Sequence, residues 1–348
     1  MNTHSDVLFE ELAGQFGKLG IITLNRPKAL NSLNHSMILA IHTKLSIWKS
    51  DESIKVVIIR AHEGRAFCAG GDLRSIYELT QNNHPEARDF FRDEYQLNRY
   101  IYHYPKPYIA FLDGITMGGG VGISLHGSHR VATDRMIFAM PETGIGFFPD
   151  VGGTYFLSRL RKHWGYYLGL CGTKLSVDDC LDLGIVQYKT TSESFTHIIS
   201  KLQETDFRSN PHNQVSTVLT EFQAPSKSSE LFLDQEKVDR YFSLQTMEEI
   251  KKALLQDGSE FGVSTKELLS KKSPTSLKVT LRALQLGSQR DFDHCMEQEF
   301  VLACRFLAGH DFLEGIRSVI IDKDQKPRWH PISLENLNDQ DIKKYFDI

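Results

Sequence analysis

The sequence predicts an α/β fold, because short β-rich runs alternate along the chain with stretches of helical periodicity. Its 348 residues suffice for one large or two modest domains with a substantial apolar core. Hydrophobic residues make up 41% and charged residues 24% of the chain, close to ordinary globular usage. This composition excludes a disordered chain, a collagen and a coiled-coil rod.

Five β-rich runs, each bounded by turn residues, are predicted to be strands. They span residues 20–24, 56–60, 108–113, 130–133 and 137–140. Two stretches between them have the spacing of amphipathic helices. Residues 34–48 place five apolar side chains on one helical face, namely Met37, Ile38, Ile41, Leu45 and Trp48. Residues 87–103 do so more loosely, through Phe90, Leu97 and Ile101.

The second half of the chain differs in composition from the first. Residues 210–262 are poorer in glycine and richer in charge and serine, which predicts a loop at 224–229 followed by helices. From residue 275 onward the pattern is helical again, with short elements over 312–331. We therefore predict a core over 1–209 and a helical region over 210–348 that completes the site, with no role assigned to 210–262.

Charge and hydropathy argue against two classes of partner. Forty-four acidic and forty basic residues leave a net charge of −4, without the positive field that nucleic acid binding requires. The longest stretch without a charged residue, 114–129, is shorter than a bilayer span. Residues 1–11 are polar and acidic and resemble neither a signal peptide nor a presequence, so we expect a cytoplasmic protein.

The cysteines form an odd set without a Cys-x-x-Cys pair, which favours buried thiols over disulfides or a zinc site. They are Cys68, Cys171, Cys180, Cys295 and Cys304. The histidines are scattered along the chain as well. We expect no metal and no redox cofactor.

Two glycine-rich turns, residues 66–72 and 113–122, each follow a predicted strand and expose backbone N–H groups that no side chain shields. Two such N–H groups can hold an oxyanion, and removing one typically costs about 2.7–4 kcal/mol of transition-state stabilisation. For either turn alone, tight turning and close helix packing is the favoured explanation. The spacing fits neither a dinucleotide fingerprint nor a Walker loop.

A third segment, residues 138–153, sets the carboxylates of Glu142 and Asp150 eight positions apart in an otherwise apolar loop rich in Gly and Pro. Burial in such a loop raises the pKa of an acid. Acids of this kind serve as bases or nucleophiles near neutral pH. The alternative is that both residues cap neighbouring helices, and Asp150 ahead of Val151 suits an N-cap.

In this order and spacing the three segments resemble the crotonase, or enoyl-CoA hydratase/isomerase, superfamily. The resemblance begins at residues 24–33 and is best over 8–186. It implies a spiral of repeated β-β-α units that binds coenzyme A thioesters. It also implies that two backbone N–H groups, those of Gly71 and Gly119 by position, hold a thioester enolate or a tetrahedral oxyanion.

The chain departs from the hydratases of that superfamily in ways that point to one branch of it. Hydratases carry a second catalytic Glu where this sequence has Gly122, tend to have Gly in place of Asp150, and end sooner. With residues 91–98 and 312–329, these features resemble the 3-hydroxyisobutyryl-CoA hydrolases. The resemblance implies hydrolysis of a short 3-hydroxyacyl-CoA, as in valine breakdown, without separating 3-hydroxyisobutyryl from 3-hydroxypropionyl esters.

The same resemblance implies roles for individual residues. Glu142 would act as nucleophile or general base with the help of Asp150, while the N–H groups of Gly71 and Gly119 hold the oxyanion. Glu94 would contact the polar end of the substrate, which also touches Gly119, Glu142 and Asp150.

Candidate contacts to coenzyme A lie near the first turn, at Arg26, Lys28, Ala69 and Arg74. For any single cation among them, a solvated surface charge is the commoner role. Coenzyme A is part of the substrate, so no separate cofactor is implied, and self-association is left open. Two alternatives stay open as well: an enoyl-CoA hydratase or isomerase, and a catalytically silent acyl-CoA-binding protein.

Overall fold

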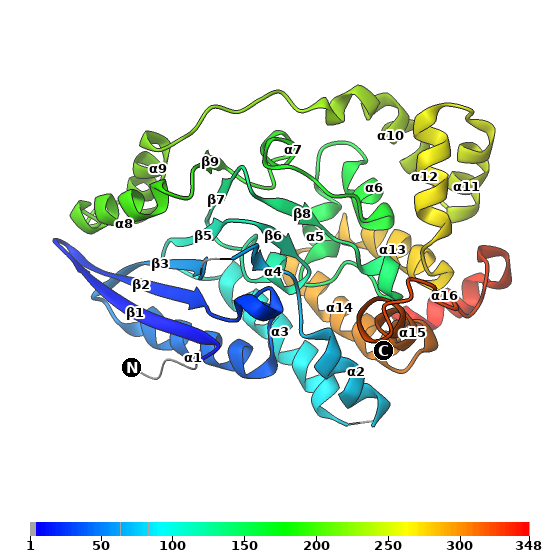
Figure 1. Ribbon diagram of the computed structural model, residues 1–348, viewed down its shortest axis with the longest axis horizontal. Helices are drawn as coiled ribbons and strands as arrows, with labels where there is room; N and C mark the ends of the chain where they lie inside the picture. The colour runs from blue at the N-terminus through cyan, green and yellow to red at the C-terminus, as the bar shows by residue number, and fades with distance from the viewer. Residues whose placement is uncertain (1–4, 63, 83, 348) are drawn as a thin grey trace. The chain divides into compact units, whose positions relative to one another are not determined.

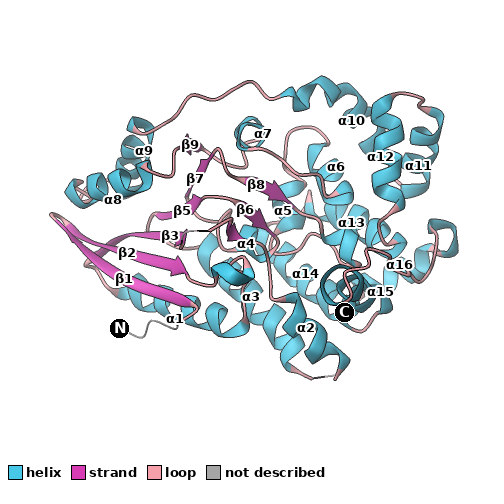
Figure 2. Ribbon diagram, in the orientation of Figure 1, coloured by secondary structure: helices cyan, strands magenta, loops and turns pink. Residues whose placement is uncertain are grey.

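The computed structural model describes residues 5–62, 64–82 and 84–347, and it confirms the α/β class. All five predicted strands and both predicted helices are present. The strands are β1 Val7–Gly14, β2 Gly17–Leu24, β3 Ile54–Ala61, β4 Ala66–Cys68, β5 Tyr108–Leu112, β6 Ile115–Met117, β7 His129–Thr133, β8 Ile137–Ala139 and β9 Tyr188–Thr190. They form a six-stranded sheet in the order β1-β2-β3-β5-β7-β9 and a three-stranded sheet in the order β4-β6-β8 (Figure 2).

The chain alternates between the two sheets in successive strand pairs. β3, β5 and β7 belong to the larger sheet, and the strands that follow them, β4, β6 and β8, belong to the smaller one. In the larger sheet β1 is antiparallel to β2, whereas β2, β3, β5, β7 and β9 are parallel to one another. Helices follow each pair, so the repeated β-β-α units that the resemblance implied are confirmed.

The helices lie between and after these strand pairs. Their bounds are α1 His35–Ser50, α2 Leu73–Gln81, α3 Glu86–Tyr102, α4 Gly119–Gly122, α5 Gly153–Leu157, α6 Trp164–Cys171, α7 Val177–Asp182, α8 Ser194–Glu204, α9 Pro211–Glu221, α10 Gln235–Phe242, α11 Met247–Gln256, α12 Glu260–Ser270, α13 Pro274–Gly287, α14 Phe292–Leu307, α15 His310–Ile316 and α16 Asp339–Phe346. None of the helices over the described residues is long and apolar enough to cross a membrane.

The chain folds into two compact units whose segments interleave along the sequence. The first, called here the sheet unit, comprises Met1–Gly71, Gln96–Phe138 and Leu175–Ser229. The second, called the helical unit, comprises Asp72–Tyr95, Ala139–Lys174 and Glu230–Ile348. The division of the chain into 1–209 and 210–348 stays a prediction.

One apolar cluster of the sheet unit lies between the larger sheet and two helices, α8 and α9 (Figure 1). Apolar side chains of the strands, among them Ile21, Ile58 and Phe111, pack against Ile198 of α8 and Val218 of α9. Burying each such side chain contributes about 1.5–3 kcal/mol. This packing holds the parallel strands from which the glycine-rich turns emerge.

Helix α1 shows how the local sequence sets an element. The five apolar residues predicted to share a face are the buried residues of this helix. The side chain of Asn34 accepts a hydrogen bond from Met37 N at 2.9 Å and caps the first turn.

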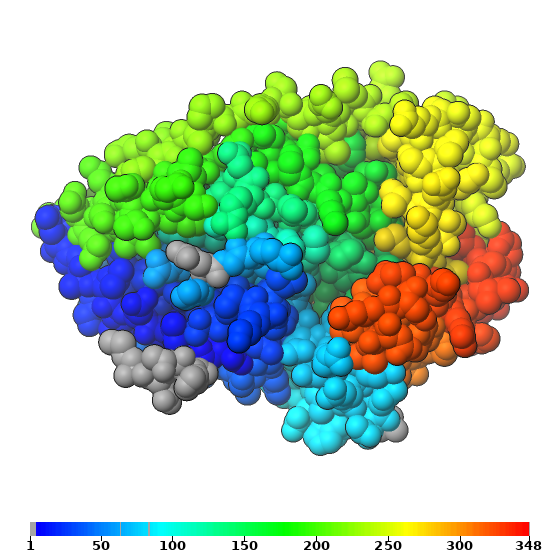
Figure 3. Space-filling model, viewed as in Figure 1, coloured from blue at the N-terminus to red at the C-terminus, as the bar shows by residue number. Residues whose placement is uncertain are grey.

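Four strands are absent from the sequence prediction: β1, β4, β6 and β9. β4 and β6 have three residues each and lie inside the two glycine-rich segments. Because glycine is typical of turns, these segments are predicted from sequence as turns without strands. The predicted loop at 224–229 and the helices after it are confirmed. Residues 322–326, within the predicted region of short elements, are exposed on the surface (orange in Figure 3).

Candidate active site

The two glycine-rich turns lie side by side in the sheet unit. β4 and β6 are parallel neighbours with Cys68 opposite Thr116, so both turns leave the same edge of the smaller sheet. Gly70, at φ 114°, approaches the second turn so closely that a Cβ atom there would stand 3.9 Å from Gly119 N. The structure therefore brings the turns that carry Gly71 and Gly119 together.

Both candidate oxyanion donors are free. Neither Gly71 N–H nor Gly119 N–H has a hydrogen-bond acceptor within residues 5–62, 64–82 and 84–347. Gly119 is the first residue of α4, and N–H groups of a first helical turn have no acceptor within the helix. Two unpaired N–H groups from neighbouring turns are suited to a developing oxyanion.

Other glycines in these turns serve packing. A Cβ at Gly120 would stand 2.3 Å from Cys68 O, and one at Gly114 would stand 2.4 Å from Arg65 O. No larger residue fits at either position without moving the backbone. Close packing therefore explains why glycine stands at positions 114 and 120. The oxyanion interpretation concerns two other glycines of the same turns, Gly71 and Gly119.

The segment with two of the coenzyme A candidates runs along the first turn. Ala69 N donates to Leu30 O at 3.1 Å, and Leu33 N donates to Gly70 O at 2.8 Å. Lys28 is exposed on the 3₁₀ turn Pro27–Ala29 of this segment. Lys28 lies two residues before Leu30, which is paired with Ala69, so it stays a candidate for a phosphate contact.

The other two cations are less free to bind phosphate. Arg26 donates to Ser32 O at 2.7 Å, and its Nε lies 3.4 Å from the Asp6 carboxylate. Arg26 therefore supports its own loop. Arg74 is exposed on α2 in the helical unit, where it donates to Ile320 O at 3.4 Å.

The three predicted acids are buried in the helical unit. Glu94, Glu142 and Asp150 are 2%, 6% and 5% exposed. Burial raises the pKa of each, and for Asp150 it does so to about 7. The charge of Asp150 further raises the pKa of Glu94 and Glu142, so each of these two carboxyl groups lies within electrostatic range of Asp150.

Asp150 is held by a tyrosine and caps no helix. Tyr95 OH donates to Asp150 Oδ2 at 2.7 Å. The N-cap of the following helix, α5, is Gly152. The capping interpretation is therefore wrong for Asp150, whose side chain faces Tyr95 instead.

Glu142 and Glu94 each leave an oxygen without a partner. Glu142 Oε2 and Glu94 Oε1 are buried and have no hydrogen-bond partner among the residues that the structure describes. Glu142 is the first residue of the 3₁₀ turn Glu142–Ile145, whose N-cap is Pro141. Buried polar atoms are nearly always paired, so the unpaired oxygens make Glu94 and Glu142 candidates for contact with a ligand.

One cation lies near Glu142. The positive charge of Lys272 lowers the pKa of Glu142, against the larger effect of burial. The Nζ atom of Lys272 lies close to Gly144 and Gly172. A Cβ atom added to either glycine would stand 3.3 Å from this Nζ. The two glycines therefore leave space for the ammonium group.

Aromatic side chains support the loop that carries Glu142 and Asp150. Phe147 lies against Phe91, Phe306 and Phe312, with ring centroids 5.4, 5.4 and 4.5 Å away. Phe148 stacks on Phe306 at 5.6 Å. This apolar packing excludes water from the loop and explains why the acids beside it are desolvated.

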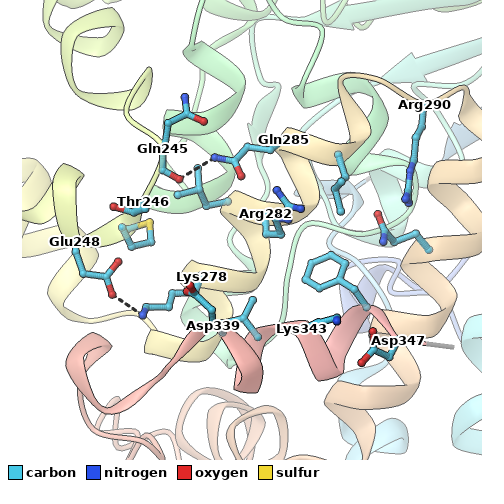
Figure 4. A pocket seen from close by; sticks show the side chains of 16 residues that line it. Gln245, Thr246, Glu248, Lys278, Arg282, Gln285, Arg290, Asp339, Lys343 and Asp347 are labelled. Carbon is cyan, nitrogen blue, oxygen red and sulfur yellow. Dashed lines mark hydrogen bonds and ion pairs between the residues drawn. The ribbon is translucent and has the colours of Figure 1, made fainter.

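Two cavities of the helical unit contain none of the predicted site residues. The first, of about 630 Å³, lies among α11, α13, α14 and α16 and is lined by both acids and bases, such as Glu248, Lys278 and Asp339 (Figure 4). The second, of about 200 Å³, reaches Lys272 and Trp329.

Sequence reasoning missed two residues of this site, Tyr95 and Lys272. Tyr95 directly follows Glu94, so the spacing of apolar residues on that helix could have pointed to it. Nothing local distinguishes Lys272 from other lysines. Four of the five cysteines are buried, as predicted, and Cys304 is partly exposed. Among the described residues no cluster of His, Cys, Asp and Glu could hold a metal ion.

Comparisons with known proteins agree on one family. The enoyl-CoA hydratase/isomerase family model matches residues 19–346. The chain is 43% identical to "3-hydroxyisobutyryl-CoA hydrolase, mitochondrial" of Rattus norvegicus and 42% identical to that of Homo sapiens, in both cases over 99% of this chain and 90% of the relative.

Solved structures agree with the sequence relatives. A carnitinyl-CoA dehydratase from Mycobacterium thermoresistibile has a TM-score of 0.89 and 34% identity, covering 99% of this chain and 97% of its own. An enoyl-CoA hydratase from Rhodobacter sphaeroides 2.4.1 has a TM-score of 0.88 and 32% identity, with 98% and 97% covered. The chain belongs to the crotonase, or enoyl-CoA hydratase/isomerase, superfamily.

Proposed function

We propose that the protein is an acyl-CoA thioester hydrolase that converts 3-hydroxyisobutyryl-CoA, with 3-hydroxypropionyl-CoA as a second substrate, to the free hydroxy acid and coenzyme A. The observation that carries the proposal is which acidic residues the site contains. Glu142 and Asp150 are both buried with raised pKa values, whereas Gly122 stands where hydratases carry their second Glu. The relatives at 42–43% identity named as hydrolases support the same assignment.

The first chemical step moves charge onto the thioester oxygen. Attack on the carbonyl carbon makes a tetrahedral oxyanion, which Gly71 N–H and Gly119 N–H would receive. Both donors are free and fixed by the backbone, so they need no reorganisation as the charge develops.

Glu142 supplies the attack in one of two ways. Its carboxylate adds to the carbonyl carbon, the carbon–sulfur bond breaks, coenzyme A leaves as the thiolate, and water then hydrolyses the mixed anhydride. Alternatively it takes a proton from water, which attacks directly. Its raised pKa makes Glu142 a stronger base than an exposed carboxylate, and Lys272 favours the ionised form that either route needs.

Asp150 and Glu94 would govern what is hydrolysed. Asp150, held by Tyr95, would orient the water or bind the 3-hydroxyl group. Glu94 has a bare buried oxygen that a substrate hydroxyl would satisfy. A site built to pair with a hydroxyl discriminates against acyl chains that lack it, because a buried polar group is then left unpaired.

The test is thiol release measured over a panel of 3-hydroxyacyl-CoA, unsubstituted acyl-CoA and enoyl-CoA esters. The proposal expects rapid thiol release from the 3-hydroxy esters and slow release from butyryl-CoA. The likeness to the enoyl-CoA hydratase from Rhodobacter sphaeroides 2.4.1 favours a second candidate, an enoyl-CoA hydratase. Rapid hydration of crotonyl-CoA, with no thiol released from any hydroxy ester, establishes that candidate and rejects the hydrolase.

Two wider predictions stay untested. The relatives carry "mitochondrial" in their names, and a cytoplasmic location of this chain is a prediction. Fractionation of cells that produce the protein decides the compartment. Self-association is also open, and sedimentation of the purified chain measures it.

A further inference from the structure

Glu299 on α14 is a buried carboxylate that holds the segment just after Asp150. The side chain is fully buried, with a solvent exposure of 0%. Its two oxygens accept three hydrogen bonds: from Gly152 N at 2.7 Å, from Thr154 N at 2.9 Å and from Thr154 Oγ1 at 2.5 Å. Glu299 therefore fixes two backbone N–H groups within four residues of Asp150, from 145 residues away in the sequence.

The backbone between Asp150 and these bonds is in an unusual conformation. Val151 has φ 51° and Gly152 has φ 86°, both in the left-handed region. For a β-branched residue such as Val151 this conformation is strained. Strain of this kind persists only where surrounding contacts impose it, and the three bonds to Glu299 are such contacts. The turn determines the direction in which the Asp150 side chain leaves the backbone.

The chemistry of Glu299 suits this task. Gly152 is the N-cap of α5 and has no side chain to accept from the first helical N–H groups. Glu299 accepts from Gly152 N and Thr154 N instead, because each of its two carboxyl oxygens offers an acceptor. A Gln at this position would replace one carboxyl oxygen by an NH₂ group. This NH₂ donor would then face another donor, from Gly152 or Thr154.

The electrostatic interactions among Glu299, Asp150 and Tyr95 agree with the hydrogen bonds described above. Burial raises the pKa of Glu299 to about 8 and raises the pKa of Tyr95 as well. The charge of Asp150 adds to both shifts, and the charge of Glu299 adds to the shift of Tyr95. The three groups are therefore within electrostatic range of one another. Glu299 has no contact that places it among the reacting atoms.

We propose that Glu299 is a positioning residue that sets the Asp150 carboxylate against Tyr95 by clamping Gly152 and Thr154. The proposal rests on the hydrolase function proposed above. It gives α14 a defined task in catalysis that the sequence motifs of the site do not reveal. Because Glu299 acts through Asp150, its effect on the rate must depend on Asp150.

The test is a double-mutant cycle on thiol release from 3-hydroxyisobutyryl-CoA, with Glu299→Gln made alone and in the Asp150→Asn background. Misplacing a catalytic group by about 1 Å costs on the order of 10²-fold, so Glu299→Gln alone is expected to lower kcat by about 10- to 100-fold with KM within about threefold. In the Asp150→Asn background the same change is expected to lower kcat by less than about twofold.

A matched control separates positioning from loss of stability. Leu302 is buried on the same helix and lies outside the clamp. Leu302→Ala is expected to lower Tm at least as much as Glu299→Gln, yet to keep kcat within about threefold. An equal loss of kcat for Glu299→Gln in both backgrounds, or a wild-type kcat in Glu299→Gln, overturns the proposal.

A second variant and a second measurement cover the other outcomes. Should Glu299→Gln fail to fold, Thr154→Val removes one hydroxyl donor only and enters the same cycle with a smaller expected loss of about threefold to tenfold. Hydrogen exchange over residues 150–157 reports the clamp without activity. Faster exchange there in the variant, with other segments unchanged, is expected, and unchanged exchange overturns the clamp. Absence of thiol release from the wild type rejects the proposed function instead.

Discussion

The two units present chemically different kinds of group. In the sheet unit the candidate groups are backbone N–H donors, which do not titrate and need no particular side chain beyond glycine. In the helical unit they are buried carboxyl groups whose action depends on their ionisation. In the proposed mechanism, the groups of the sheet unit would suit any reaction that develops an oxyanion, and the carboxyl groups of the helical unit would decide which reaction follows. The predictions below test this division.

The largest effect is expected from Glu142→Gln in the helical unit. The amide has the same volume but neither attacks a carbonyl nor takes a proton from water, so kcat should fall by about 10³–10⁴-fold. Thiol release measures the rate, and circular dichroism checks folding. Glu267→Gln, at an exposed position on α12, is the control and should keep the wild-type rate. A Glu142→Gln rate within tenfold of wild type removes Glu142 from the mechanism.

The next largest effect is expected from Gly119→Pro in the sheet unit. Proline removes the N–H, and the first position of a helix tolerates its ring. Losing one oxyanion donor should lower kcat by about 10²–10³-fold. Gly119→Ala keeps the N–H and should lose much less. Because an N–H group does not titrate, the pH profile of Gly119→Pro should keep the wild-type midpoint, and a shifted midpoint would argue against the division.

Most of the fold and part of this site could be predicted from sequence. Five strands and the buried face of α1 follow from periodicity, because packing against one core imposes a repeat on the chain. Glu142 and Asp150 stand out because charged residues are rare in an apolar loop. β4 and β6 were missed because three residues are too few to establish a period.

The residues that could not be predicted act over long sequence distances. Glu299 meets Gly152 from 147 positions away, and no local pattern encodes such a contact. One signal does exist: Glu299 falls on the otherwise apolar stripe of α14, between Met296 and Leu302. A carboxylate in such a stripe must find donors elsewhere, but the sequence does not say where.

A third prediction concerns stability in the helical unit, where Asp150→Asn should stabilise the fold above pH 7. Burial raises the Asp150 pKa from 3.8 to about 7, so the native state keeps a proton that the unfolded chain has lost. Wild-type stability therefore falls as pH rises from about 4 to 7. Removing the acid should add roughly 1–4 kcal/mol at pH 8 and little at pH 4.

Urea denaturation at pH 4 and pH 8 measures this gain. The control lies in the sheet unit, where Arg208 lowers the pKa of exposed Asp206 to about 2. That shift has the opposite sign, so Asp206→Asn should bring no gain at pH 8. A gain for Asp150→Asn that is equal at both pH values would show that its charge is not the cause.

The smallest effect is expected from Lys28→Ala, at the exposed turn just before Leu30, which pairs with Ala69 in the sheet unit. A solvated ammonium contributes about 0.2–1 kcal/mol to an ion pair, so KM for the acyl-CoA should rise by about two- to fivefold with kcat unchanged. Added salt should shrink the difference, since it screens exposed charges. Lys201→Ala, another exposed lysine of the same unit, should leave KM unchanged.

An acyl-pantetheine thioester makes the Lys28 measurement specific. This ester keeps the reacting bond but lacks the nucleotide and its phosphates, so Lys28→Ala should not change its KM. If KM rises equally for both esters, Lys28 acts on the turn around Ala69 and not on a phosphate. The sheet unit would then supply oxyanion donors alone, and the contact to the nucleotide would have to come from other cations such as Arg74 of the helical unit.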